Sequence, residues 1–261
     1  VNDAENRQSL LYGIGDQQLD VVLSKLQNRY KVDVTLSKPK FAFRETIRKK
    51  VKVQGRHKKQ SGGHGQFGDV IMEFEPSGDL EKPYVFEEKV FGGSVPKNYF
   101  PAVEKGLQDC VVKGPLAGYP VVGLKATLLD GSYHPVDSSE MAFKMAATLA
   151  FKKGFMDANP VLLEPIASVK VVVPDKFTGD VMGDLNRRRG RVLGMNSLHG
   201  GKQEIVADVP MSEMFGYNTD LRSMTGGIGV FSYEFSRYEQ APGDVQKKEV
   251  EARTAGGEVE A

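Results

Sequence analysis

Two stretches of alternating apolar and polar residues predict a long β-hairpin in the first third of the chain. Apolar side chains alternate with basic or polar ones over residues 47–53, and with acidic ones over 70–75. A period of two is typical of a half-buried strand. The glycine-rich stretch between them, 55–68, is longer than the roughly two to five residues of an ordinary hairpin turn. We therefore expect two strands joined by a long loop.

A third apolar stretch, 121–128, predicts another strand, followed by a connection over 129–138 and a helix over 139–153. Asp137 and Glu140 resemble a capping box, in which a carboxylate accepts from free N–H groups and an acid suits the positive end of the helix dipole. The positions that recur at helical spacing, and should face a core, are Ala142, Met145, Ala146 and Leu149.

The last third of the chain has a recognisable order of elements. After a boundary at 160–165, marked by two prolines, the pattern predicts strand, helix, strand, strand, helix and strand. This order is that of the ferredoxin-like fold. The expected ranges are 167–173, 175–188, 190–197, 203–210, 213–223 and 230–235.

The two ends of the chain carry weaker patterns. Strands are expected at 9–12 and 31–36 with a helix between them, too little to enclose a core, so residues 1–40 predict half a domain. The tail, 241–261, is charged and without apolar periodicity, and we expect it to be disordered. The fold class is thus α+β, with several domains.

Composition is that of an ordinary soluble protein, but its charge is unevenly placed. The 261 residues are 40% hydrophobic and 26% charged, with a net charge of +1. Eight lysines and arginines lie within 44–59 against one acid, Glu45, and acids gather within 73–88. Because binding depends on local potential, the near-neutral total does not exclude a nucleic-acid partner.

Other features of the sequence bear on its cellular setting. Cys110 is the single cysteine, which excludes an internal disulfide framework and fits a reducing cytoplasm. No apolar run approaches the roughly 18 residues of a membrane helix, and we expect no signal peptide. We expect a cytoplasmic protein with no membrane partner. The chain begins with Val1 rather than Met, which suggests a fragment of a longer protein.

Patterns that could indicate catalysis or cofactor binding lack the context that they need. Residues 63–68 match G-x-G-x-x-G, but these glycines lead into a strand and do not open a helix. No P-loop motif occurs, and the four histidines are too scattered for a metal site. Ser132, His134 and Asp137 lack a nucleophile elbow and an oxyanion-hole motif. We expect no catalytic, cofactor or metal site in this chain.

The two connections 55–68 and 129–138 each combine glycine, histidine and nearby positive charge. Glycine permits close backbone approach to phosphates, imidazole and Tyr can stack or hydrogen-bond with bases, and Lys and Arg attract the RNA backbone. RNA binding competes here with a plain connector or a solvated basic face. The arginine-rich stretch 186–191 follows a helix, where cations also favour the negative dipole end, although four arginines exceed that role.

Many runs, taken together, carry a resemblance that covers nearly everything from residue 10 to 242. The runs are KQSGG (59–63), GQFG (65–68), GSYH (131–134), VDSSEMAFK (136–144), PVLLEPI (160–166), GDVMGDLNRRRG (179–190), EMFGY (213–217) and LRS (221–223). Through them the chain resembles the bacterial elongation factor G family, translational GTPases that drive ribosomal translocation.

The resemblance implies a domain for each part of the chain. Residues 1–40 would be the second half of the family's domain III, 41–164 its domain IV, a decoding-site arm of ribosomal-protein-like βαβ type, and 165–240 its ferredoxin-like domain V. GTP and magnesium would bind in an N-terminal domain outside this chain, and the full-length parent would be the GTPase. The implied partner is the ribosome, with its rRNA, tRNA and mRNA, and the protein would be a monomer.

The resemblance also implies which residues contact nucleic acid. The tip of domain IV would hold the tRNA–mRNA pair in register without breaking a bond, through Ser61, Gly62, Gly63, His64, Gly65, Gln66, Gly131, Ser132, Tyr133 and His134. Domain V would face large-subunit RNA through Arg187, Arg188, Arg189 and Arg191.

Some of these positions depart from the family pattern. His64 stands where Arg is usual, Pro135 where an acid is usual, Gln18 where His is usual, and 226–229 lacks a common basic residue. Two hypotheses therefore remain. One is a translocase whose loops grip RNA on the ribosome, and the other is a ribosome-binding accessory paralogue, of the recycling or resistance type, without full translocase activity.

Overall fold

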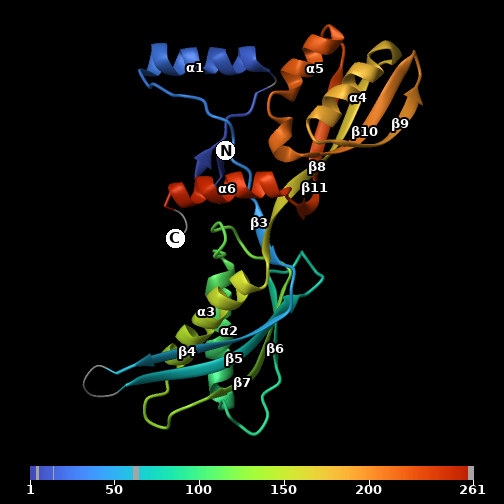
Figure 1. Cartoon of the computed structure of the whole chain (residues 1–261). Coiled ribbons are helices and arrows are strands. Elements are labelled where there is room, and N and C mark those ends of the chain that lie inside the picture. The colour runs from blue at the N-terminus through green and yellow to red at the C-terminus, as the bar shows by residue number, and fades with distance from the viewer. Residues whose placement is uncertain (4–5, 14, 61–64, 258–261) are drawn as a thin grey trace. The chain divides into compact units, whose positions relative to one another are not determined.

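The structure is a computed structural model that describes residues 1–3, 6–13, 15–60 and 65–257 (Figure 1). The chain divides into two compact units, Val1–Ala42 with Glu164–Glu239, and Phe43–Leu163 with Gln240–Ala261. The first is called the ferredoxin-like unit below, and the second the hairpin unit. Across the described ranges, no helix has both the length and the apolarity needed to span a bilayer.

A four-stranded sheet in the order β4-β5-β7-β6 forms the hairpin unit. β4, β5 and β7 are antiparallel neighbours, whereas β6 runs parallel to β7 and reaches it through a helical crossover, as the predicted βαβ type requires. The elements are β3 (Arg44–Ile47), β4 (Val51–Lys59), β5 (Gln66–Pro76), β6 (Tyr84–Glu88), η1 (Lys97–Tyr99), α2 (Phe100–Val111), β7 (Leu124–Ser132) and α3 (Glu140–Asp157). Strand β3 pairs outside this sheet, with the start of β8.

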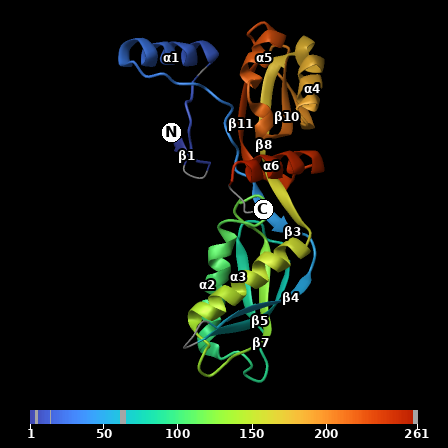
Figure 2. The same cartoon turned by 60° about the vertical axis from the view of Figure 1, so that its left-hand side comes forward.

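Helix α3 packs on β4 and β5, and α2 packs on α3, so both helices lie on one face of the sheet (Figure 2). The alternation in β5 is confirmed, because Val70, Met72 and Phe74 are buried on the helix side. The opposite face of this sheet, here called the open face, carries the residues between them in β5 and their partners Lys52, Gln54, Arg56 and Lys58 in β4.

The predicted loop over 55–68 is mostly strand. β4 continues to Lys59 and β5 begins at Gln66, so the glycines at 55 and 68 lie inside strands. A Cβ on Gly55 would stand 2.1 Å from the carbonyl oxygen of Ala146, and one on Gly68 would stand 2.3 Å from that of Ala142. These glycines therefore mark the close approach of α3, because glycine within a strand leaves room for a neighbouring backbone.

Helix α3 also differs from its prediction. Its N-cap is Ser139, whose hydroxyl accepts from the Ala142 N–H at 3.2 Å, and not Asp137. Ala142 and Ala146 are buried as expected, but Met145 and Leu149 are exposed. The helix packs against both the sheet and α2, so its buried residues include a second set, Phe143, Ala147, Ala150, Phe151 and Phe155.

The ferredoxin-like unit has the predicted βαββαβ order. Its sheet runs β11-β8-β10-β9, and α4 and α5 pack on the face that carries Val171, Ile205 and Val209 (Figure 1). The elements are β8 (Pro160–Pro174), η2 (Asp175–Phe177), α4 (Thr178–Arg187), β9 (Arg191–Leu198), β10 (Lys202–Pro210), η3 (Met211–Met214), α5 (Tyr217–Thr225) and β11 (Val230–Gln240). The prolines at 160 and 165 do not interrupt β8, and the two units divide between Leu163 and Glu164.

The N-terminal segment contains β1 (Asn2–Asp3), β2 (Gln8–Ser9) and α1 (Asp16–Tyr30). The strand predicted at 31–36 is wrong, since those residues are in no strand and Val32, Val34 and Leu36 are exposed. An alternating segment becomes a strand only when a neighbour pairs with it, and the structure describes no such neighbour here.

The prediction that the tail is disordered is wrong for residues 243–255, which form α6 (Gly243–Ala255). Val245 and Val250 pack on the small cluster of Phe43, Tyr119 and Leu162 in the hairpin unit. The Arg253 guanidinium lies 4.2 Å from the Tyr119 ring centroid, and its Nε donates to the Ala117 carbonyl at 3.0 Å. Polar side chains thus help to anchor a helix whose sequence lacks an apolar stripe.

Candidate nucleic-acid interface

The predicted contact residues of domain IV gather at one end of the sheet, here called the tip, where β4 ends, β5 begins and β7 ends. Gln66 is the first residue of β5, and Gly131 and Ser132 are the last of β7, so these three lie in strands and not in loops. Ser61, Gly62, Gly63 and His64 fall outside the described residues. Gly65, Tyr133 and His134 lie in connections, and half of the His134 side chain (52%) is exposed.

Several of these side chains have structural partners. The Ser132 hydroxyl donates to Asp69 Oδ2 at 2.7 Å, and the Gln66 amide oxygen lies 2.8 Å from His57 Nε2. A Cβ at Gly131 would stand 2.2 Å from the Asp69 carbonyl oxygen, so glycine is required there for strand packing. These three residues shape the tip, whereas Tyr133 and His134 present side chains to solvent.

Asp137 joins the two connections of the tip. Its Oδ1 accepts from the Gly65 N–H at 3.0 Å, and its backbone carbonyl accepts from the Phe67 N–H at 2.8 Å. Ser138 adds a further link, because its hydroxyl accepts from the His134 N–H at 2.8 Å and donates to the Phe67 carbonyl at 2.9 Å. The second connection is therefore bonded to β5 by main-chain and side-chain groups.

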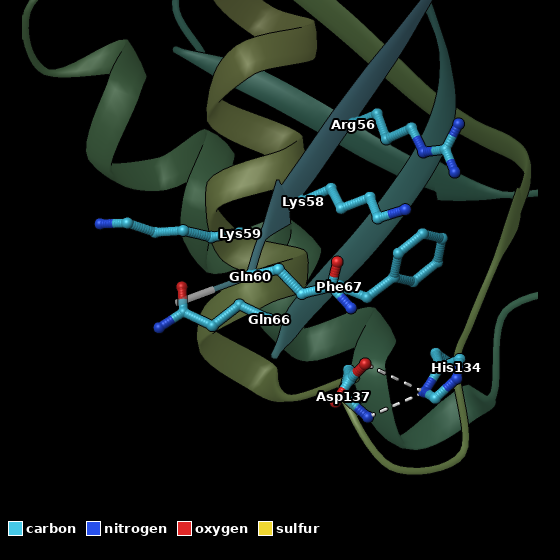
Figure 3. A pocket seen from close by; sticks show the side chains of 8 residues that line it. All are labelled: Arg56, Lys58, Lys59, Gln60, Gln66, Phe67, His134 and Asp137. Atoms are coloured by element: carbon cyan, nitrogen blue, oxygen red, sulfur yellow. Dashed lines mark hydrogen bonds and ion pairs between the residues drawn. The ribbon is translucent and has the colours of Figure 1, made fainter. Parts of the chain in front are cut away.

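The same network fixes the imidazole of His134. Its Nδ1 accepts from the backbone N–H of Asp137 at 3.1 Å (Figure 3). It also accepts from the backbone N–H of Val136 at 3.3 Å. A ring nitrogen that accepts carries no hydrogen, so these bonds fit the neutral ring with its proton on Nε2. Asp137 Oδ2 also lies 3.4 Å from the same Nδ1. His134 then offers one N–H donor at Nε2.

A shallow hollow of about 270 Å³ lies beside His134 (Figure 3). Most of its lining residues are basic or polar, and they come from β4, β5 and the 133–138 connection. They are Arg56, Lys58, Lys59, Gln60, Gln66, Phe67, His134 and Asp137. A hollow with this lining suits a negatively charged ligand better than an apolar one.

The cations at the tip differ from those farther along the same sheet. Lys50 is paired with Glu73 and Glu75, at 2.8 and 3.2 Å, and these pairs raise the pKa of the lysine. At the tip, no carboxylate among the described residues lies within ion-pair distance of Arg56 or Lys58. Within the part of the chain that the structure describes, Lys50 is thus neutralised by carboxylates, whereas Arg56 and Lys58 have no carboxylate partner.

The predicted arginine cluster of domain V divides into two kinds. Arg188 donates to Asp184 at 2.8 Å and pairs with Asp220, and Arg189 donates both terminal nitrogens to Glu164 at 2.8 Å. These two guanidiniums hold the end of α4 against the rest of the domain. Arg187 is 78% exposed, with Asp184 3.5 Å away, and Arg191 pairs with Asp208 at 3.2 Å. RNA contact stays a prediction for all four, and Arg187 is the least engaged.

Sequence reasoning missed Arg56, Lys58 and Phe67 as individual site residues and assigned Asp137 to the wrong role. The sequence could have placed Arg56 and Lys58 together, because residues two apart in a strand lie on the same face. The pairing of Lys58 with Phe67 depends on the β4/β5 register, which the assumed long loop concealed.

Comparison with known proteins identifies the class to which this architecture belongs. Three family models match consecutive parts of the chain: Elongation Factor G, domain III over residues 1–38, Elongation factor G, domain IV over 39–159, and Elongation factor G C-terminus over 161–249. The chain belongs to the elongation factor G family.

A solved structure agrees with this assignment over nearly the whole chain. A protein from Thermus thermophilus, solved by crystallography, is 44% identical, with a TM-score of 0.84. The match covers 98% of this chain and 38% of the Thermus protein, so the chain spans well under half of that protein's length.

Proposed function

We propose that this chain is the ribosome-contacting part of a translation elongation factor, and that its tip meets RNA in the decoding region while tRNA and mRNA move. Family membership supports the elongation-factor role. The observation that carries the proposal for the tip is the joining of the two connections through Asp137, beside cations that have no acidic partner among the described residues. Such an arrangement presents a fixed donor and a positive surface to an RNA backbone.

The role that we propose is mechanical and not chemical. No group of three or more His, Cys, Asp or Glu side chains suited to a metal ion occurs among the described residues. The tip would hold the tRNA–mRNA pair through hydrogen bonds and charge while the factor advances. We further propose that GTP and magnesium bind in another domain of the longer protein, which would supply the energy for movement.

The test is a His134→Ala substitution in the full-length protein, with translocation and GTP hydrolysis measured separately. We expect slower movement of tRNA and mRNA with hydrolysis unchanged, because the substitution removes a donor from the tip only. His199→Ala, an exposed histidine of the ferredoxin-like unit, is the matched control. An unchanged translocation rate in the His134 variant would show that this role for the tip is wrong.

A second candidate is a ribosome-binding accessory factor of the recycling or resistance type. The sequence departures favour it, notably Pro135 beside His134 and the glycines at 226 and 227, which adopt left-handed φ values of 62° and 86° where the family often has a basic residue. Complementation separates the two candidates. Robust growth of translocase-depleted cells that carry the full-length protein would exclude the accessory role, and failure to grow with intact ribosome binding would support it.

A further inference from the structure

Three flat groups stand in a row on the open face at the tip (Figure 3). The Arg56 guanidinium lies over the Phe67 ring, 5.3 Å from its centroid, and the Phe67 and His134 ring centroids are 6.5 Å apart with a tilt of 59°. They come from β4, β5 and the 133–138 connection. Aromatic rings and guanidinium planes are the groups on which proteins stack unpaired RNA bases.

The hollow beside this row limits the size of a ligand. Its volume of about 270 Å³ is below the roughly 300–1,000 Å³ of small-molecule sites. A single planar group with an attached charge would fit, whereas a complete dinucleotide cofactor would not. The lining side chains are mostly polar, so the ligand must supply charge and hydrogen-bond acceptors as well as a flat face.

The charges around the hollow, three cations against the Asp137 carboxylate, favour an anionic ligand. Asp69 lies directly opposite Arg56 in the strand register and is the nearest candidate for an internal ion pair. Its two carboxylate oxygens are instead occupied, Oδ1 by the Gln54 amide at 2.7 Å and Oδ2 by the Ser132 hydroxyl at 2.7 Å. Arg56 and Lys58 are exposed and pair with no carboxylate among the described residues, so their charges are available to a phosphate.

We propose that this hollow is a slot for one unpaired RNA nucleotide, whose base stacks on the Phe67 row and whose phosphate meets Arg56 and Lys58. His134 would donate its Nε2 hydrogen to an acceptor on the base or ribose. A base inside a duplex cannot enter, because its faces are already stacked on its neighbours. The slot adds detail to the proposed function. The choice of RNA as the nucleic acid rests on that function.

The experiment measures binding of a fluorescein-labelled hexauridylate to the 261-residue chain by anisotropy, at several salt concentrations. A hexamer of abasic ribose phosphates serves as the second probe. We expect the chain to bind hexauridylate more tightly than the abasic hexamer, because only the former can stack. Phe67→Leu should weaken hexauridylate binding about 5- to 150-fold, the usual range for one base on one aromatic ring, and should leave abasic binding unchanged.

Matched variants separate stacking from folding and from charge. Phe67→Tyr keeps a ring and should restore binding, which guards against a misfolded Phe67→Leu protein. Lys58→Gln should weaken both probes and lower the slope of log affinity against log salt by about 0.7, the value for one phosphate on a single strand. Lys105→Gln, an exposed lysine of α2, removes the same charge elsewhere and should change neither.

Two results would overturn the slot. One is equal affinity for hexauridylate and the abasic hexamer, which would indicate a basic surface without base recognition. The other is unchanged hexauridylate binding in Phe67→Leu. These outcomes are distinguishable from a failure of the proposed function, because the binding experiments use the isolated chain and no ribosome. A ring-dependent slot together with normal translocation in the His134→Ala factor would uphold this inference and refute the function.

Discussion

The carboxylate of Asp137 holds the amide of Gly65 across the tip, and its removal gives a sharp test of how the two connections are joined. In Asp137→Ala the bond from the Gly65 N–H to Oδ1, 3.0 Å long, is lost. The backbone bonds of residue 137, from the Phe67 N–H and to His134 Nδ1, remain available. The effect should therefore centre on Gly65 and not spread over the sheet.

The magnitude follows from the kind of bond. A hydrogen bond to a charged acceptor contributes about 1.5–3 kcal/mol, and about 1.4 kcal/mol is a factor of ten in an equilibrium constant. The opening equilibrium of the Gly65 amide should thus rise about 10- to 150-fold. Hydrogen exchange followed by NMR measures this directly. Asp137→Asn keeps an acceptor oxygen without the charge, so its effect should be intermediate.

Asp130→Ala is the matched control, because Asp130 is a second tip carboxylate that accepts from a backbone N–H, that of Gly131 at 2.8 Å, and does not contact Gly65. Its removal should accelerate exchange at Gly131 only. If Gly65 exchanged at the same rate in the parent and in Asp137→Ala, the carboxylate would not be what joins the two connections. A uniform acceleration over β4 and β5 would also refute the reasoning, since it would mean loss of the sheet.

Three further predictions concern stability. Gly55→Ala forces a Cβ to 2.1 Å from backbone of α3, so we expect the free energy of unfolding in urea to fall by about 1–3 kcal/mol or more. Arg189→Ala leaves Glu164, 4% exposed, without its bidentate partner, which should cost about 3 kcal/mol in the same assay. Burial raises the pKa of Asp208, but hydrogen bonds from Arg237 and Arg191 outweigh it and the pKa lies below its ordinary 3.8. Its stabilising contribution is complete above that value and is lost as pH falls, so Asp208→Asn should flatten the acid limb of a stability–pH curve.

Each of these has a control of the same chemical type. Gly194→Ala adds a methyl group to a strand glycine with open space around it and should cost far less than Gly55→Ala. Arg187→Ala removes an exposed arginine from the same helix end. Glu234→Gln neutralises an exposed carboxylate of β11 and should leave the acid limb unchanged. If a variant changes stability no more than its control does, the stabilising role assigned to the corresponding contact is wrong.

The fold was predictable wherever an apolar pattern had a partner within the chain. The βαββαβ order of the ferredoxin-like unit followed from periodicity alone, because β8 and β10 bury one face against α4 and α5, with Val192 of β9 and Phe231 of β11 partly buried beside them. The strand expected at 31–36 has the same alternation but no described neighbour to pair with. Helix α6 is the opposite case, a helix where disorder was predicted. It is held partly by contacts such as that of Arg253 with Tyr119, which an apolar pattern does not reveal.

The sequence indicated where the candidate site lies in the chain, but not all of the residues that form it. Gly131 and His134 were named from glycine and histidine in a supposed loop, and the structure brings them to the tip with Gly65. Arg56, Lys58 and Phe67 required the β4/β5 register, which pattern alone does not supply. For Asp137 the sequence indicated a helix cap, yet Ser139 lies closer to the first turn and takes that role.

Glycine explains why the site lies on strands rather than on a long loop. Gly55 and Gly68 let α3 approach β4 and β5, and these two strands pair as far as Lys59 and Gln66. A stiff hairpin fixes the spacing of Arg56, Lys58 and Phe67, whereas a 14-residue loop would have to order them on binding, at about 1–2 kcal/mol for each backbone residue. The glycines that suggested a long loop in the sequence are thus the residues that place the proposed interface on paired strands.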